Sequence, residues 1–228
     1  MNDAENNMFD ELFIDPENKG GEFFIPYTSK AKCLKMLHSK GKQVTRNRGL
    51  WMLAKWYRFE TSRNAGKYDA VACDELIGII LDFARKYPDP GFGIASMLGC
   101  EGSCSEKSGD YESALKFYKA SLGFPVSDPD LKYFRLNNLG FCLNFFRKFE
   151  AAEEFLRAAV AMAPERYNAW KNLGVTLEHQ LKYEEAAECY LEAISQSRGE
   201  PRAIGHYRRL LERQPALAGK YPEIENEE

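Results

Sequence analysis

Three groups of residues in this sequence have types and spacings that could support catalysis or metal binding. Cys100 and Cys104 are four residues apart, so a helix would present both thiols on one face. Structural zinc needs four ligands, however, and no histidine or second cysteine pair lies near these two in the sequence. His38, His179 and His206 fall in different predicted helices, without the serine and aspartate neighbours of a nucleophilic triad.

The remaining candidate, Gly91-Phe92-Gly93, lacks the preceding strand and the other residues of a dinucleotide-binding fingerprint. The six cysteines are scattered along a chain that is large enough to have its own core, which favours reduced thiols over a disulfide framework. The N-terminus is acidic and lacks a basic and then apolar opening, and the longest apolar run, Leu76–Leu81, is far shorter than the ~20 residues of a membrane-spanning helix. The sequence thus predicts a cytoplasmic protein with no membrane segment, no cofactor, no metal and no enzymatic activity.

The other aromatic and polar residues are positioned by a pattern that occurs twice, 34 residues apart, between residues 133 and 198. Within each copy, apolar residues recur at intervals of three or four, which is one face of an α-helix, on both sides of a short turn. Gly140 and Gly174 would let the two helices of a copy approach closely. A hairpin of this size cannot bury its apolar face alone, so the fixed period predicts that the copies stack. The pattern consists of Leu136, Leu139, Gly140, Leu143, Phe149, Ala152, Leu156 and Ala159 in the first copy, and of Trp170, Leu173, Gly174, Leu177, Tyr183, Ala186, Tyr190 and Ala193 in the second.

This pattern resembles the tetratricopeptide repeat (TPR), in which an aromatic residue, a Leu-Gly pair, a Tyr, an Ala, a second aromatic residue, an Ala and a Pro follow one another. The second copy departs from it at Leu177, which replaces the Tyr, and the first copy has Leu136 in place of the first aromatic residue. A weaker third copy precedes the first of these two by 38 residues and contains Leu98, Gly102, Gly109, Tyr111, Ala114 and Tyr118. The resemblance implies an all-α fold, a right-handed α-solenoid of stacked antiparallel helix hairpins, with extra N-terminal helices and a C-terminal capping helix.

Composition and turn residues divide the chain into five predicted segments. The basic helical region contains a hairpin over 45–87 whose first helix lacks the Leu-Gly pair, and whether this hairpin is a true repeat is left open. A hinge is expected at Pro88–Gly93, where prolines end the preceding helix. The segments are an acidic tail and anchor (1–27), the basic helical region (28–90), three TPR-like repeats (91–200), the capping helix (201–213) and a loose acidic tail (214–228).

In the TPR family, the first helix of each hairpin lines a concave groove that holds a peptide or a helix of a partner. The resemblance therefore implies a non-catalytic protein–protein interaction module, such as a scaffold, adaptor or chaperone-like protein. Asparagine amides would hold an extended backbone, phenylalanine rings would anchor apolar side chains, and arginines would bind carboxylates of an acidic or C-terminal peptide. Exposed apolar groove residues would also suit a homodimer. Carried over by spacing, the peptide-binding residues are Phe134, Asn137, Asn138, Phe141 and Phe145 from one repeat, Lys171, Asn172 and His179 from the next, and Arg202, His206 and Arg209 from the capping helix.

Some TPR co-chaperones hold a C-terminal carboxylate in a clamp of Lys, Asn and Arg residues. Asn138 or Asn172, together with Arg202, could fill parts of that role here. Asn137 and Phe141 stand where the clamp has Lys and Asn, however, and His206 stands where it has Arg. The clamp is not intact, so the sequence does not predict specificity for heat-shock-protein tails.

Charge blocks suggest an alternative function. Residues 18–67 carry a net charge of +10 within a chain whose net charge is −3, and the basic segment 30–58 contains Trp51, Trp56 and Tyr57 as candidate base-stacking platforms. This segment could bind nucleic acid, or it could neutralise the acidic parts of the chain. The absence of any nucleic-acid fold signature favours the protein partner. Whether the acidic tails occupy the groove is left open.

Overall fold

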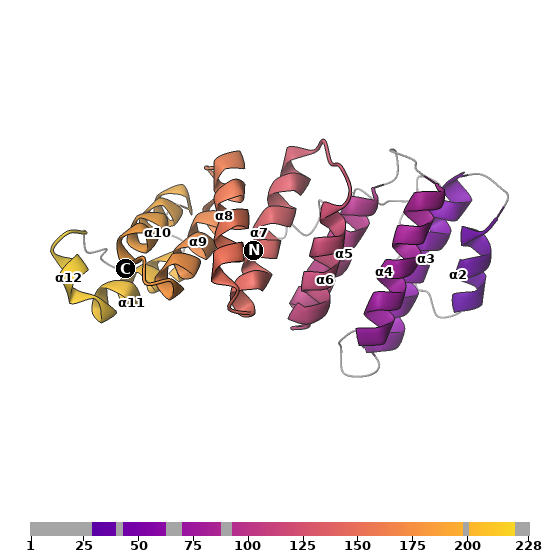
Figure 1. The fold of residues 1–228 in the computed structure, drawn as a ribbon, viewed down its shortest axis with the longest axis horizontal. Helices are drawn as coiled ribbons and strands as arrows, with labels where there is room; N and C mark the ends of the chain where they lie inside the picture. The colour runs from indigo at the N-terminus through magenta and orange to yellow at the C-terminus, as the bar shows by residue number, and fades with distance from the viewer. Residues whose placement is uncertain (1–28, 40–42, 63–69, 88–92, 198–200, 222–228) are drawn as a thin grey trace. The chain divides into compact units, whose positions relative to one another are not determined.

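The computed structural model describes residues 29–39, 43–62, 70–87, 93–197 and 201–221, and the regular secondary structure of these residues is entirely helical (Figure 1). This confirms the all-α prediction. The predicted N-terminal tail, most of the predicted hinge and the last acidic residues lie outside the described residues. The helices are α2 (Lys30–Leu37), α3 (Gln43–Ser62), α4 (Ala70–Lys86), α5 (Ile94–Lys107), α6 (Tyr111–Leu122), α7 (Pro129–Phe145), α8 (Phe149–Met162), α9 (Tyr167–His179), α10 (Tyr183–Ser197), α11 (Pro201–Arg213) and α12 (Pro215–Ala218).

The chain forms two compact units, residues 1–110 and 111–228. In the first unit, α2 packs closely on α3 at Gly49, where a Cβ atom would lie 2.8 Å from Cβ of Met36. A partly buried ion pair joins α3 to α5, because Arg58 donates two hydrogen bonds to the carboxylate of Glu101, which is fully buried. The basic helices of this unit therefore use at least one of their cations internally.

In the second unit, the two helices of the hairpin α7–α8, and likewise those of α9–α10, approach each other closely at a glycine. A Cβ atom on Gly140 would lie 2.5 Å from Cγ of Leu156, and a Cβ atom on Gly174 would lie 2.5 Å from Cε1 of Tyr190. Both distances are far below an ordinary van der Waals contact, so only glycine fits these positions without a shift. The predicted close approach of the two helices is confirmed.

The turn inside each hairpin has the same backbone geometry. Gly109, Arg147 and Leu181 have φ angles of 76°, 57° and 63°, which lie in the left-handed region. In the last two turns, the amide of the following residue donates to a carbonyl five residues back, with N···O distances of 2.9 Å for both Lys148 and Lys182. This is the Schellman ending of a helix, in which glycine is the favoured left-handed residue. Arg147 and Leu181 hold that conformation at a steric cost that glycine would avoid.

The loop between α6 and α7 depends on a buried arginine that sequence reasoning missed. Arg135 is 7% exposed, and its Nη1 donates to the carbonyls of Ser121, at 2.6 Å, and Phe124, at 3.0 Å. Ser121 lies in the last turn of α6 and Phe124 follows the helix, where backbone carbonyls have no intrahelical N–H to accept from. Burial lowers the pKa of Arg135 from its ordinary value.

A network of charges links α8 to the hairpin α9–α10. Glu153 accepts hydrogen bonds from Lys182 at 2.8 Å and Gln180 at 2.9 Å, and Arg157 bridges Glu153 and Glu185. Burial alone would raise the pKa of Glu153, but the hydrogen bonds outweigh this effect and lower its pKa to about 2. The ionised carboxylate of Glu153 therefore connects its own repeat to the next one.

The C-terminal residues differ from the predicted loose tail. Leu217, in α12, is only 6% exposed, and the hydroxyl of Tyr221 lies 3.3 Å from the carbonyl oxygen of Glu184 and 3.2 Å from the carboxylate of Glu188. Two apolar residues among polar ones are enough to fix this segment to the core, which the tail's composition concealed. Of residues 214–228, those up to Tyr221 are described, and they extend the packed structure.

Candidate functional site

Two of the asparagines predicted to face the groove are buried in the helix packing. Asn137 is 8% exposed and Asn172 is 7% exposed, and Nδ2 of Asn172 donates to Oδ1 of Asn137 at 3.0 Å. Asn137 in turn donates to Asn138 at 2.9 Å, and Asn138 donates to the hydroxyl of Tyr118 at 3.1 Å. Buried amides must be paired, and here they pair with each other across α6, α7 and α9. The expectation that these amides hold a peptide backbone is therefore corrected: they connect neighbouring helices instead.

Two further polar residues, which the sequence reasoning missed, extend this network. Asn144 donates from Nδ2 to the backbone carbonyl of Asn172 at 3.1 Å, and its Oδ1 accepts from the hydroxyl of Thr176 at 2.9 Å. Asn144 lies seven residues after Asn137, which is two helical turns along the same face. That spacing is the signal that could have identified it.

The three predicted phenylalanines differ in what they present to solvent. Phe145 is 57% exposed, and its ring stacks on that of Tyr111 with a centroid distance of 4.0 Å. Phe141 is half-buried and meets Tyr111 edge-on at 6.0 Å. Phe134 is half-buried and packs edge-on against Tyr118 at 6.4 Å. Phe145 is thus the ring of the three that is best placed to contact a partner.

On α9, the exposed residue of the predicted set is His179. Its ring stacks on that of Phe149 with a centroid distance of 4.6 Å, and the guanidinium of Arg147 lies 5.8 Å from the centroid of Phe149. Lys171 is half-buried. The turn-side ends of α7 and α9 therefore both carry an exposed aromatic ring that is supported by a second ring.

The basic residues of α11 face α9 and α10. Arg202 is exposed and lies 3.4 Å from the hydroxyl of Tyr167. His206 stacks on Tyr190 with a centroid distance of 5.5 Å, and its Nδ1 lies 3.1 Å from Nη2 of Arg209, which is also exposed. The structure thus brings these three predicted residues together with the last hairpin.

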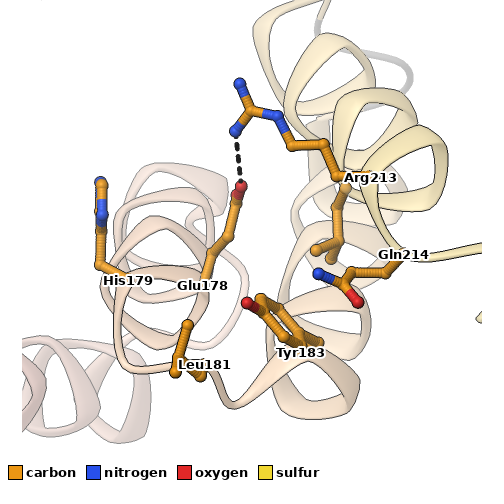
Figure 2. Close-up of a pocket in the computed structure, with 7 residues that line it drawn as sticks. Glu178, His179, Leu181, Tyr183, Arg213 and Gln214 are labelled. Carbon is orange, nitrogen blue, oxygen red and sulfur yellow. Dashed lines mark hydrogen bonds and ion pairs between the residues drawn. The ribbon is translucent and has the colours of Figure 1, made fainter.

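A pocket lies between the turn of the last hairpin and the end of α11 (Figure 2). On one side, Arg213 and Glu178 form an ion pair with an N···O distance of 3.3 Å. Glu178 also accepts a hydrogen bond of 2.9 Å from the hydroxyl of Tyr190. Burial raises the pKa of Tyr190 well above its ordinary value, and the charge of Glu178 raises it further, so this phenol remains a donor. The pocket is lined by Glu178, His179, Leu181, Tyr183, Leu210, Arg213 and Gln214.

The sequence from α8 to α10 matches a known repeat family. Residues 146–201 match the tetratricopeptide repeat. This part of the chain carries the tetratricopeptide repeat. Among solved structures, MamA from Desulfovibrio magneticus RS-1 (residues 41 to the end) is similar with a TM-score of 0.51 and 19% identity, over 73% of this chain and 86% of that chain.

Two other solved structures give comparable values. A double mutant of MamA RS-1 has a TM-score of 0.50 and 18% identity, over 73% of this chain and 85% of that chain. The first TPR domain of human RPAP3 has a TM-score of 0.48 and 22% identity, over 56% of this chain and 97% of that chain. A search of curated proteins found no significant match. At these identities the likeness to solved structures concerns the fold.

The TPR period shows how the predicted surface changes along the chain. Positions 34 residues apart occupy the same place in α7, α9 and α11. Phe145 on α7 corresponds in this way to His179 on α9 and to Arg213 on α11, and all three are exposed. The surface of the TPR array therefore changes from aromatic on α7 to cationic on α11.

The basic segment 30–58, considered as an alternative nucleic-acid-binding surface, has one of its predicted stacking rings buried. Tyr57 is 3% exposed and meets Trp56 edge-on at 5.1 Å. The ammonium group of Lys30 lies 4.9 Å from the ring centroid of Tyr57 and 5.6 Å from that of Trp56. Tyr57 is therefore not a platform for base stacking, contrary to the expectation from its sequence position.

The structure also shows the state of the cysteines, the grouping of possible metal ligands and the apolar length of the helices. All six cysteines are free thiols, and burial raises the pKa of Cys189 to about 12, which makes its thiolate inaccessible at neutral pH. Within the described ranges, no group of three or more histidine, cysteine, aspartate or glutamate side chains is arranged to hold a metal ion. None of the helices in those ranges is long and apolar enough to cross a membrane.

Proposed function

We propose that this TPR protein is a non-catalytic interaction module that binds a peptide or helix of a partner protein. The binding surface is the face to which α7, α9 and α11 contribute their exposed side chains. The observation that carries this proposal is the sequence of equivalent exposed residues Phe145, His179 and Arg213. Such a surface suits a ligand with an apolar side chain at one end and an acidic group at the other.

The dimensions of a TPR array are consistent with a short ligand. Packed helices lie about 8–10 Å apart, so three successive first helices span about 20 Å. An extended peptide rises about 3.3 Å per residue, and about six residues therefore cover that distance. A contact of this size is consistent with micromolar affinity, about −8 kcal/mol.

The partner that we propose is a different protein in the cytoplasm, which need not carry a heat-shock-protein tail. The inward pairing of Asn137 and Asn172 supports this view, because a clamp built on asparagine amides would need them on the surface. The remaining polar recognition would then come from the arginines of α11. A homodimer through the exposed ring of Phe145 is the competing use of the same surface.

A capture experiment with matched variants tests the proposal. The full chain is immobilised, and proteins that it retains from a lysate are identified and quantified by mass spectrometry after cross-linking. Phe145→Ala should reduce retention of the specific partner about tenfold, the loss typical of an exposed aromatic anchor that becomes buried on binding. Met162→Ala is the control, because Met162 is 41% exposed on α8 and lies outside the proposed surface.

Thermal unfolding of both variants shows whether each remains folded. Equal retention by Phe145→Ala and wild type, or an equal loss in both variants, would contradict the proposed surface. Size-exclusion chromatography of the wild type over a range of concentrations separates partner binding from self-association. A dimer that Phe145→Ala abolishes would favour the competing use.

A further inference from the structure

Leu181 departs from two local preferences at once. Its φ angle of 63° is one that an L-residue adopts at a cost, and its large apolar side chain is 70% exposed. The equivalent turn positions hold Gly109, which has no such cost, and Arg147, which is charged. A residue that is unfavourable in both conformation and exposure is more easily explained by a contact made outside this chain.

The pocket beside Leu181 contains polar groups with unused hydrogen-bonding capacity. Within the described part of the chain, neither the side-chain amide of Gln214 nor the hydroxyl of Tyr183 makes a hydrogen bond, and both line the pocket (Figure 2). The guanidinium of Arg213, which is 69% exposed, contributes one contact to Glu178 and has five N–H groups. Gln214 offers both a donor and an acceptor, which is what a peptide group requires.

The apolar part of the pocket completes the arrangement. Among the lining residues, Leu210 is fully buried, Tyr183 is half-buried and Leu181 is exposed. Glu178 already accepts hydrogen bonds from Tyr190 and Arg213, so its charge is compensated. The unused capacity that remains is a surplus of donors next to an apolar surface.

We propose that this pocket binds a segment of a partner protein in which an apolar side chain lies next to a carboxylate. The apolar side chain contacts Leu181 and Tyr183, the adjoining peptide group is held by Gln214, and the carboxylate is held by Arg213. This inference rests on the proposed function and specifies the partner's chemistry at one end of the binding surface. The carboxylate has two sources, the C-terminus of a chain that ends in an apolar residue or an acidic side chain beside such a residue.

Three short synthetic peptides distinguish these sources in titrations of the ¹⁵N-labelled full chain, followed by NMR. The first is acetylated and ends in Gln-Leu with a free carboxylate, the second contains Glu-Leu-Ser with an amidated terminus, and the third contains Gln-Leu-Ser with an amidated terminus. The first or second should shift the signals of the Gln214 side-chain amide and of Leu181 far more than the third does. Whichever of the two does so identifies the source of the carboxylate.

Variants at the turn provide the matched comparison. Leu181→Gly and Leu181→Asn both suit the left-handed conformation and remove the apolar side chain, and each should weaken binding of the preferred peptide about tenfold. Arg147→Gly changes the same position in the preceding repeat and should leave binding unchanged. Arg213→Gln should remove the preference for a carboxylate, so that the third peptide binds as well as the others.

Several results would overturn this inference. They are equal binding of the three peptides to the wild type, absence of shifts at the pocket, or unchanged binding by both Leu181 variants. Concentration-dependent shifts at the pocket without peptide would mean that a second copy occupies it, which also overturns the inference. If the capture experiment still shows dependence on Phe145, the proposed function stands and only the pocket assignment fails; if capture depends on neither Phe145 nor Leu181, the proposed function fails as well.

Discussion

Gly174 is one of two glycines at which the helices of a TPR hairpin approach closely, and substituting alanine there tests the geometry of the hairpin. Alanine is favoured over glycine inside a helix by about 1 kcal/mol, so an unhindered substitution should stabilise the protein. At Gly174, however, the new Cβ would lie 2.5 Å from Cε1 and 2.6 Å from Cδ1 of Tyr190. The ring would have to retreat by about 1 Å to reach an ordinary contact.

Tyr190 has little freedom to move. It is fully buried, its hydroxyl donates to Glu178, and its ring stacks on His206. Overpacking of this kind costs about 1–3 kcal/mol. We therefore expect Gly174→Ala to lose the gain from helix propensity and to be less stable than the wild type, by up to about 2 kcal/mol.

Gly205 is the matched control, because a Cβ atom added there meets nothing within 4 Å. Gly205→Ala gains the same helix propensity without the clash, so the difference between the two variants isolates the overpacking cost of about 1–3 kcal/mol. Urea unfolding followed by circular dichroism measures it, and thermal unfolding should show about 2–4 °C for each kcal/mol in a chain of this length. If Gly174→Ala were as stable as Gly205→Ala, the close approach of α9 and α10 described here would be wrong.

Three further changes test other parts of the structure. Because the pKa of Glu153 is lowered to about 2, its ion pairs stabilise the fold above pH 4.5, its ordinary pKa, and are lost as the pH falls from 4.5 towards 2. The free energy of urea unfolding of the wild type should fall by about 1–2 kcal/mol over that range, and that of Glu153→Gln should fall by less. Arg135→Met removes the donor to two loop carbonyls and should cost about 2–3 kcal/mol, with faster amide exchange confined to the loop between α6 and α7. Asn172→Ala should cost about 1–3 kcal/mol in the same unfolding assay, because Oδ1 of Asn137 loses its donor, and unchanged stability would show that the amide chain is not formed.

The helix pairs could be predicted from the sequence because their determinants are local and repeated. The apolar positions recur every three or four residues, and Gly140 and Gly174 occur at the same place in both copies. Each such signal needs knowledge of one hairpin only. The structure adds that Gly49 plays a similar part between α2 and α3, which the sequence did not reveal because no second copy of that contact exists to compare it with.

The candidate site was harder to predict because its determinants lie between repeats. The spacing correctly gave neighbouring places to Asn137 and Asn172, but whether a polar side chain points to solvent or to its neighbour depends on what the adjacent helix offers. Both helices carry an amide at the point of contact, so the two amides satisfy each other and become buried. The phenylalanines show the same dependence on neighbours. Both Phe141 and Phe145 contact the ring of Tyr111, yet Phe141 is half-buried and Phe145 is exposed.

This dependence also explains why unused polar groups gather at the pocket. Inside the array, polar residues on successive first helices meet at a spacing of 35 residues, as Asn137 meets Asn172 and Glu178 meets Arg213. Gln214 follows directly after α11, and in the described part of the chain the only helix beyond it is the four-residue α12. Within the described residues, no further hairpin is stacked there, and the donors of Arg213 and Gln214 meet no counterpart from a next repeat. We therefore expect that a further designed TPR hairpin, stacked after Arg213, abolishes peptide binding at the pocket while it raises the stability of the preceding hairpin.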